Sequence, residues 1–194
     1  MDIRIEVALI AAVVTAAGWL ITHVMQVRRE REKESREALL KYTERQLEEL
    51  YGPLAFLIIE GRRTFHDLLE NLGRSQVFAV DGTISPGDLK TWLFWAEHDA
   101  IPRNGRIKDL LATKTHLIEG TAMPESYKAL LDHHNSWIIN HLRWQKEQVP
   151  YSWHSKTNYP VEFEREVLLT FSDLKRRHAE LVVALGNKSE RLTS

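Results

Sequence analysis

The first strong pattern in the chain is an unbroken apolar run close to its N-terminus. From Val7 to Val27 the sequence reads VALIAAVVTAAGWLITHVMQV, and His23 is the one residue of the run whose side chain can carry a charge. An α-helix rises about 1.5 Å per residue, so the run covers roughly 30 Å, the thickness of the hydrocarbon core of a bilayer. The pattern therefore predicts a transmembrane helix.

A secretion signal cut after Ala17 is the alternative interpretation of this run. The apolar residues continue beyond that point to Val27, whereas the apolar region of a signal is about 7–15 residues long. The positive charge that a signal carries before its apolar region is also weak, because Arg4 is offset by Asp2 and Glu6. We therefore favour a retained anchor.

Basic residues on the two sides of the run predict its orientation. Only Arg4 and the terminal amine precede it, whereas five basic residues follow it closely: Arg28, Arg29, Arg31, Lys33 and Arg36. Lysine and arginine beside a membrane span stay on the cytoplasmic side. The sequence thus predicts a single-pass protein whose N-terminus lies outside and whose remaining chain is cytoplasmic.

Residues 28–51 look like a charged continuation of the same helix. Basic and acidic residues alternate at a spacing of four, for example at Lys33, Glu37 and Lys41, and each such pair stabilises a helix by about 0.2–0.5 kcal/mol. This spacing is typical of a solvated stalk. A surface for anionic lipid headgroups is the less favoured alternative, because acidic residues are interleaved with the basic ones.

Beyond residue 51, apolar residues recur at helical spacing in several segments that proline and glycine divide. The expected helices run from Pro53 to Leu72 with a stop at Gly73, from Pro86 to about Ala100 with Ser85 as N-cap, from about Asn104 to Glu119 before Gly120, from Pro124 to just before Val149, and from Pro160 to Gly186. A loop is expected between residues 74 and 86, with Val77 to Val80 extended before an Asp81-Gly82 turn.

Several amphipathic helices with short connections predict an all-α fold, a helical bundle behind the membrane helix. We divide the chain into a transmembrane anchor (1–27), a charged juxtamembrane helix (28–51), a helical bundle domain (52–186) and a tail (187–194). Gly52-Pro53 interrupts the helical pattern, and the sequence leaves open whether this point is a hinge or a fixed corner.

Three stretches carry a resemblance to known sequences: QLEELYGPLAFLI from Gln46, KTHLIEGTAMP from Lys114 and NYPVEFEREV from Asn158. With them, the chain resembles a group of short, uncharacterised bacterial proteins that have an N-terminal membrane helix and a helical cytoplasmic body. The resemblance covers most of the chain and implies a bacterial inner membrane protein. It implies no catalytic residue and no ligand.

Composition removes several classes of function. The 26 basic and 27 acidic residues give a formal net charge of −1, so no basic excess indicates a nucleic-acid partner. There is no cysteine, which excludes disulfides and thiolate chemistry and is typical of a reducing compartment. No phosphate-binding glycine motif occurs, so nucleotide binding has no support in the sequence.

Nine histidines raise the hypothesis of a metal centre. A di-iron bundle uses Glu-x-x-His on paired helices, and this chain has only the reverse order once, from His116 to Glu119. The other candidate set of ligands is His133, His134, His141 and His154. Neither set has the spacing of a known metal site, so we expect no metal and no cofactor.

The most patterned stretch begins at His133. His134, Trp137, His141 and Trp144 follow one another at spacings of three, four and three, which places them on one stripe of a helix. We favour the interpretation that this stripe packs against another helix of the bundle. The alternative is a face for a protein partner or for self-association, because tryptophan dominates interface energies.

From these patterns we expect a non-catalytic interaction or sensor module that a membrane holds in place and that acts through protein contacts. Trp137, His141, Trp144 and His134 are the residues we expect to bind. One alternative is an oligomeric effector that disturbs the bilayer, because small residues between Ala11 and Gly18 offer faces for helix association. An enzyme that uses the histidines is the least favoured alternative.

Overall fold

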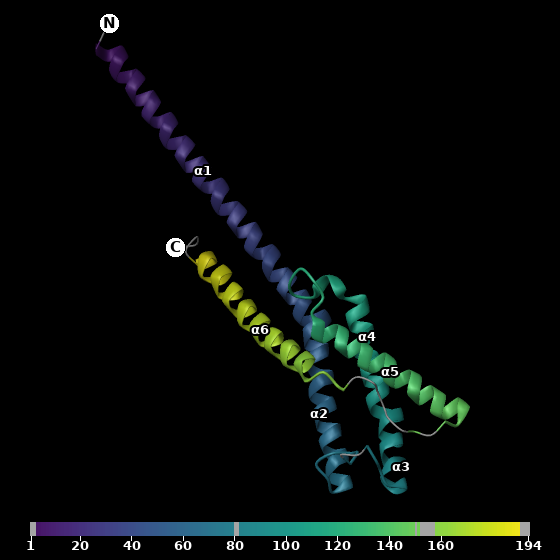
Figure 1. The fold of residues 1–194 in the computed structure, drawn as a ribbon. Coiled ribbons are helices and arrows are strands. Elements are labelled where there is room, and N and C mark those ends of the chain that lie inside the picture. Colours follow the sequence, from purple (N-terminus) through teal and green to yellow (C-terminus); the bar gives the residue numbers. More distant parts are fainter. Residues whose placement is uncertain (1–2, 80–81, 150, 152–157, 191–194) are drawn as a thin grey trace. The chain divides into compact units, whose positions relative to one another are not determined.

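The computed structural model describes residues 3–79, 82–149, 151 and 158–190, and within these ranges it describes side chains from residue 14 to residue 186. Every regular element in the described residues is a helix, which confirms the all-α prediction (Figure 1). The chain divides into two compact units. One contains Met1–Thr43 and Arg177–Ser194, and the other contains Glu44–Arg176.

The first unit is dominated by α1 (Ile3–Gln46), a long helix that continues without interruption from the apolar run into the charged segment. Lys33 and Glu37 form one of the predicted ion pairs, at 3.6 Å. Among the residues whose side chains the structure describes, no helix is long and apolar enough to cross a membrane. The predicted span begins at Val7, so its first part, residues 7–13, lies outside those described side chains.

The second unit holds the bundle and contains two prolines inside continuous helices. A π-helical turn, η1 (Leu47–Tyr51), leads directly into α2 (Gly52–Leu72), with Pro53 in its first turn. Likewise α3 (Pro86–Trp95), the π-helical turn η2 (Ala96–Ala100) and α4 (Ile101–Thr113) follow one another without a gap around Pro102. The expectation that a helix ends near Ala100 was therefore wrong.

The wide π-helical turns explain how the prolines are accommodated. The N–H of Gly52, just before Pro53, donates to the carbonyl of Leu47 five residues back, and the N–H of Ile101 donates to Ala96 in the same way. Proline lacks an N–H and its ring clashes with a preceding carbonyl in a regular helix, so a wider turn makes room for it. A Cβ on Gly52 would lie 2.5 Å from the Leu47 carbonyl oxygen, so glycine is required there.

The helix expected to end at Glu119 ends at Thr113 instead, and a short 3₁₀ helix, η3 (Thr115–Leu117), follows. Two interactions hold this segment out of the helix. Gln46 Nε2 donates to the Leu117 carbonyl at 2.9 Å, and the Glu119 N–H donates to the Tyr51 hydroxyl at 2.9 Å. Tertiary hydrogen bonds thus override the local helical pattern.

The other predicted helix ends agree with the structure, except for the end of the last helix. Gly73 ends α2 with a left-handed φ of 63°, and the Ser85 hydroxyl caps α3 by accepting from the Asp88 N–H at 3.2 Å. α5 covers Glu125–Glu147, close to the expected range. α6 covers Val161–Glu190 and continues past Gly186, where its end was expected.

One compact group of buried side chains joins η1, α2, α4, η3, α5 and α6 within the second unit. We call it the leucine-rich core, and it comprises Leu50, Tyr51, Leu54, Leu57, Ile58, Ile107, Leu111, Leu117, Ile118, Tyr127, Leu130, Phe163, Val167 and Leu174. Hydrogen bonds from Gln46 and to Tyr51 seal its edge near Glu119. Such burial is the main source of the stability of the fold.

Candidate functional site

A second group of buried side chains, rich in tryptophan, lies where α2, α3, η2 and α5 meet. It is built on Leu68, Val77, Trp92, Ala96, Ala100 and Trp137, with Trp95 and Phe78 packed against it. The rings of Trp92 and Trp137 stack at 5.5 Å with 12° between their planes. Trp137 Nε1 donates to the hydroxyl of Tyr151 at 3.0 Å, which fixes the indole ring.

A cavity of about 680 Å³ opens beside this aromatic group, and we call it the tryptophan pocket. Its apolar wall comes from α2, the 75–79 loop, α3, η2, α4 and α5: Leu57, Ile58, Phe65, Val77, Phe78, Trp92, Trp95, Ala100, Ile107 and Trp137. Its polar wall comprises Arg62, Ser75, Gln76, Arg103, Asn104, His133, Tyr159 and Glu164, and Gly61, Ala79 and Gly82 complete the lining. The volume falls within the range of small-molecule sites, which are mostly apolar with a few placed polar groups.

Arg103 is the central residue of the polar wall. Its side chain is only 7% exposed, and its Nη1 donates to Asp99 Oδ2 at 2.6 Å and to Thr64 Oγ1 at 3.0 Å. The Thr64 hydroxyl in turn donates to Asp99 at 2.8 Å. A buried arginine needs such a partner, because an unpaired charge away from water is costly. The Arg103, Asp99 and Thr64 side chains therefore form one closed network.

Gly61 and Trp95 hold the guanidinium of Arg103 from two directions. A Cβ on Gly61 would lie 2.7 Å from Arg103 Nε and 3.1 Å from its Cζ, so any other residue at this position of α2 would displace the guanidinium. The Arg103 Cζ also lies 5.9 Å from the centre of a Trp95 ring, a cation–π distance. Arg103 thereby connects the aromatic wall to the polar wall.

Asn104 is the least satisfied polar side chain of the pocket. It is 5% exposed, it lines the cavity, and among the described residues its amide has no hydrogen-bond partner. Buried polar side chains are nearly always paired, so an unpaired amide on the wall of a cavity indicates a ligand or bound water.

The remaining charged residues of the pocket are paired with each other. Arg62 Nε donates to the carboxylate of Glu164, which joins α2 to the first turn of α6. Tyr159 lies beside them, and burial, reinforced by the nearby Glu164 carboxylate, raises the pKa of its hydroxyl far above the usual value. At neutral pH the Tyr159 hydroxyl is therefore protonated.

The structure places the predicted stripe of α5 mostly inside the second unit. Trp137 is buried and lines the tryptophan pocket, His134 and His141 are buried as well, and Trp144 is partly exposed. Burial lowers the pKa of both His134 and His141 below its ordinary value. Neither ring nitrogen of His141 has a hydrogen-bond partner among the described residues.

The histidines proposed as metal ligands are dispersed in other roles. His116 Nε2 lies 3.2 Å from Arg45 Nη2, and Glu119 accepts a hydrogen bond from Gln46. His133 contacts the rings of Trp137 and Tyr159, whereas His154 lies outside the described residues. Within the described part of the chain, no three histidine or carboxylate side chains are grouped so that they could hold a metal ion.

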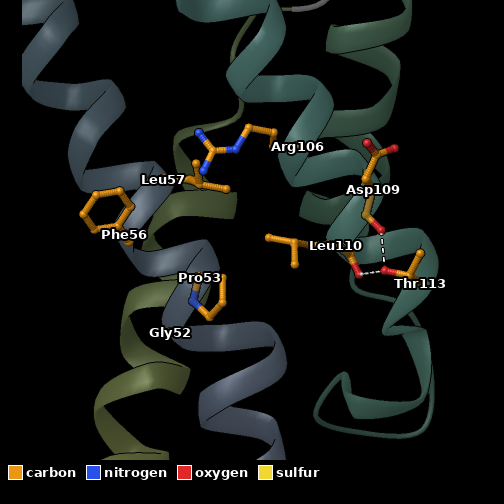
Figure 2. Close-up of a pocket in the computed structure, with 8 residues that line it drawn as sticks. All are labelled: Gly52, Pro53, Phe56, Leu57, Arg106, Asp109, Leu110 and Thr113. Carbon is orange, nitrogen blue, oxygen red and sulfur yellow. Dashed lines mark hydrogen bonds between the residues drawn. The ribbon is translucent and has the colours of Figure 1, made fainter.

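A second cavity, of about 600 Å³, lies between α2 and α4 (Figure 2). It is a more open groove whose polar side chains are Arg106, Asp109 and Thr113, and Phe56 at its edge is 62% exposed. The Thr113 hydroxyl donates back to the carbonyl of Asp109 at 2.7 Å. The groove shows no buried polar side chain without a partner, so the tryptophan pocket is the better candidate site.

Sequence reasoning identified Trp137 but missed Gly61, Arg103 and Asn104. Arg103 and Asn104 stand beside Pro102, where a helix end was expected, and two adjacent polar residues there are typical of a loop. Gly61 lies within the expected helix after Pro53, where glycine costs about 1 kcal/mol relative to alanine. A glycine at a position where no turn is expected was the one signal in the sequence that another group packs closely against this helix.

Comparisons with protein families, with curated proteins and with solved structures found no match to this chain.

Proposed function

We propose that this chain is a non-catalytic sensor module that a membrane holds in place and that takes up a small aromatic molecule in the tryptophan pocket. The observation that carries the proposal is the cavity of about 680 Å³ with an aromatic wall on one side and buried polar groups on the other. Sites for small molecules combine these two features. A ligand there would contact α2, α3, α4 and α5 at once.

Membrane attachment forms part of the proposal and rests on the apolar run from Val7 to Val27. Six large apolar side chains of the described part of this run are exposed on α1: Val14, Trp19, Leu20, Ile21, Val24 and Met25. Exposing such a continuous apolar surface to water is unfavourable, and the acyl chains of a bilayer can bury it. The basic residues from Arg28 onward support a cytoplasmic location for the second unit, at a bacterial inner membrane.

A binding role is supported over a catalytic one by the pairing of the charged groups in the pocket. Arg62 holds the carboxylate of Glu164, and Arg103 holds that of Asp99. A carboxylate acts as a general base or as a nucleophile only when it is free to reach the substrate. These carboxylates are engaged in holding helices together, so we propose that the pocket recognises a molecule and does not transform it.

Output to a protein partner or to a second copy of the chain completes the proposed function. A ligand that contacts four helices stabilises the arrangement in which those contacts are made, and it shifts the protein toward that arrangement. Restriction to a membrane surface raises the effective concentration of the partners. Trp144, which is partly exposed on α5 close to His141, is our candidate for that contact.

The test is binding of 1-naphthalenemethanol, an uncharged aromatic alcohol, to the full-length chain in detergent micelles, followed by saturation-transfer NMR. We expect saturable binding at one site per chain. Replacing Ala100, which is 2% exposed and lines the pocket, by leucine should abolish this binding because the side chain fills the cavity. The matched control, Ala112→Leu, alters an exposed position of α4 and should bind normally.

Two outcomes would count against the proposal. The first is no saturable signal above that of empty micelles. The second is equal binding by wild type and by a folded Ala100→Leu variant, since the probe would then occupy some other site.

A further inference from the structure

We propose that the ligand of the tryptophan pocket is an uncharged aromatic molecule carrying one carboxamide-like group, and that Asn104 recognises this group. The inference rests on the proposed function and deepens it, because it assigns a chemical class to the molecule that is bound. It follows from three features of the pocket: the balance of its charges, the unpaired amide of Asn104 and the geometry of its aromatic wall.

The first feature is that the charges of the polar wall cancel. Arg62 pairs with Glu164, and Arg103 pairs with Asp99, so each arginine already has its own carboxylate. An ionised ligand would add a charge that nothing balances, in a site walled by tryptophan and leucine side chains. Placing an uncompensated charge in such surroundings is costly, so the pocket favours an uncharged ligand.

The second feature is the amide of Asn104, which is buried against the cavity without a partner among the described residues. An asparagine side chain offers two N–H donors and one carbonyl acceptor in a single plane. A carboxamide on the ligand matches both, because it can accept from one Asn104 N–H and donate to the Asn104 carbonyl. A carboxylate would leave that carbonyl unmatched, and a hydrocarbon would leave the whole amide unmatched.

Arg103, which lines the same cavity as Asn104, also favours a ligand that carries a carbonyl oxygen. Both hydrogen bonds of Arg103 use Nη1, so its Nε and Nη2 have no hydrogen bond among the described residues. A carbonyl oxygen has two lone pairs, so it can accept from Asn104 and from an Arg103 N–H together.

The third feature is the aromatic wall, which selects the body of the ligand. The rings of Trp92 and Trp137 are nearly parallel, the Phe65 and Trp95 rings lie 5.5 Å apart, and the Phe78 ring meets Trp92 edge-on. These rings pack on one another and together line one cavity. An aromatic ligand suits such a wall, because aromatic rings pair by offset stacking or by edge-to-face contact.

The experiment compares three probes that share one ring system: 1-naphthaleneacetamide, 1-naphthaleneacetate and 1-naphthalenemethanol. Calorimetric titration of each into the full-length chain in the same micelles gives the three dissociation constants. We expect the acetamide to bind about tenfold more tightly than the other two, because it alone pairs with both sides of the Asn104 amide.

Substitution of Asn104 assigns this preference to one residue. In Asn104→Leu we expect the acetamide to lose about tenfold in affinity, while 1-naphthalenemethanol changes by less than about threefold. Asn104→Asp keeps the shape of the side chain and removes its donors, so it should lose the preference even if the leucine variant folds poorly. Asn71→Leu, at an exposed position of α2, is the matched control and should behave as wild type.

The outcomes separate this inference from the proposed function. If the acetate binds as tightly as the acetamide or more tightly, or if the Asn104 variants keep the preference, the carboxamide assignment is overturned while the pocket remains a binding site. If none of the three probes binds, the proposed function itself fails.

Discussion

The leucine-rich core and the tryptophan pocket lie in the same unit of the chain and use their buried amides differently. At the edge of the leucine-rich core, Gln46 Nε2 donates to Leu117 and Glu119, and the Tyr51 hydroxyl accepts from the Glu119 N–H, while Gln46 Oε1 has no partner among the described residues. On the wall of the tryptophan pocket, Asn104 has no hydrogen bond to any described residue. One amide connects two segments of the fold, and the other makes no such connection.

The contrast shows how one small bundle can separate folding from recognition. Leucine, isoleucine and valine with two tyrosines and one phenylalanine fill the first region, whereas a cavity opens beside the large flat rings of the second. Cavities and unpaired polar groups lower stability. We therefore expect substitutions in the leucine-rich core to affect mainly the free energy of unfolding, and substitutions in the pocket to affect mainly binding.

The largest expected effect comes from emptying the leucine-rich core. Phe163 is fully buried, so Phe163→Ala should lower the free energy of unfolding by about 3–5 kcal/mol, as measured by urea denaturation of the full-length chain. Leu169, on the same helix, is 55% exposed, and Leu169→Ala is the matched control, with an expected change within about 0.5 kcal/mol. A similar loss in the free energy of unfolding in the two variants would show that Phe163 is not buried in the leucine-rich core.

The second effect compares one amide from each region. Gln46→Leu removes two hydrogen bonds and leaves the Leu117 carbonyl unpaired, so we expect a loss of about 1–3 kcal/mol in the free energy of unfolding. Asn104→Leu removes an amide without a partner, so the free energy of unfolding should rise by about 1 kcal/mol. A loss of stability in the Asn104 variant would mean that its amide is satisfied in the folded protein.

The third effect tests the close approach of Arg103 to α2. In Gly61→Ala the new methyl group meets the guanidinium, so we expect a loss of about 1–2 kcal/mol in urea denaturation, although alanine is the better helix former. Gly105→Ala on α4 has open space around the new Cβ and should gain up to about 1 kcal/mol. An equal gain in the free energy of unfolding in both variants would show that the Arg103 guanidinium does not lie against Gly61.

The smallest expected effect is a pH dependence carried by α5. Burial lowers the pKa of His134 and His141 in the folded protein, so the unfolded chain binds more protons as the pH falls below about 6.5. The free energy of unfolding should therefore be fully present above that pH and decrease below it. Urea denaturation at pH 7.5 and pH 5.5 measures the decrease.

Replacing both histidines by glutamine should flatten this pH dependence. His66→Gln is the matched control, because His66 is largely exposed and pairs with Glu70 on its own helix. A dependence that persists in the double variant would have to come from other groups.

Much of the fold follows from local sequence, as the caps of α2 and α3 show. Gly73 and Ser85 act through the chemistry of one residue, and that chemistry can be recognised without knowing the fold. Pro102 shows where such reasoning fails. Proline was expected to end a helix, but the π-helical turn before it allows the helix to continue.

The tryptophan pocket was only partly predictable. Trp137 stood out through its spacing on α5, whereas the role of Asn104 depends on residues of α2, α3 and α5 that meet it in space. A polar residue that faces a cavity and one that faces solvent have the same appearance in a sequence. The difference is tertiary, so periodicity alone cannot show it.

The π-helical turn η2 also acts as a phase shift along the continuous helix from Pro86 to Thr113. Trp95 and Arg103 are eight residues apart, which in a uniform α-helix would point them roughly 80° away from each other. A π-helical turn absorbs one extra residue, which leaves the pair offset by only about 20°. Converting this turn into regular α-helix, with no residue lost, would keep every pocket residue in the chain and still rotate the aromatic half of the site away from its polar half.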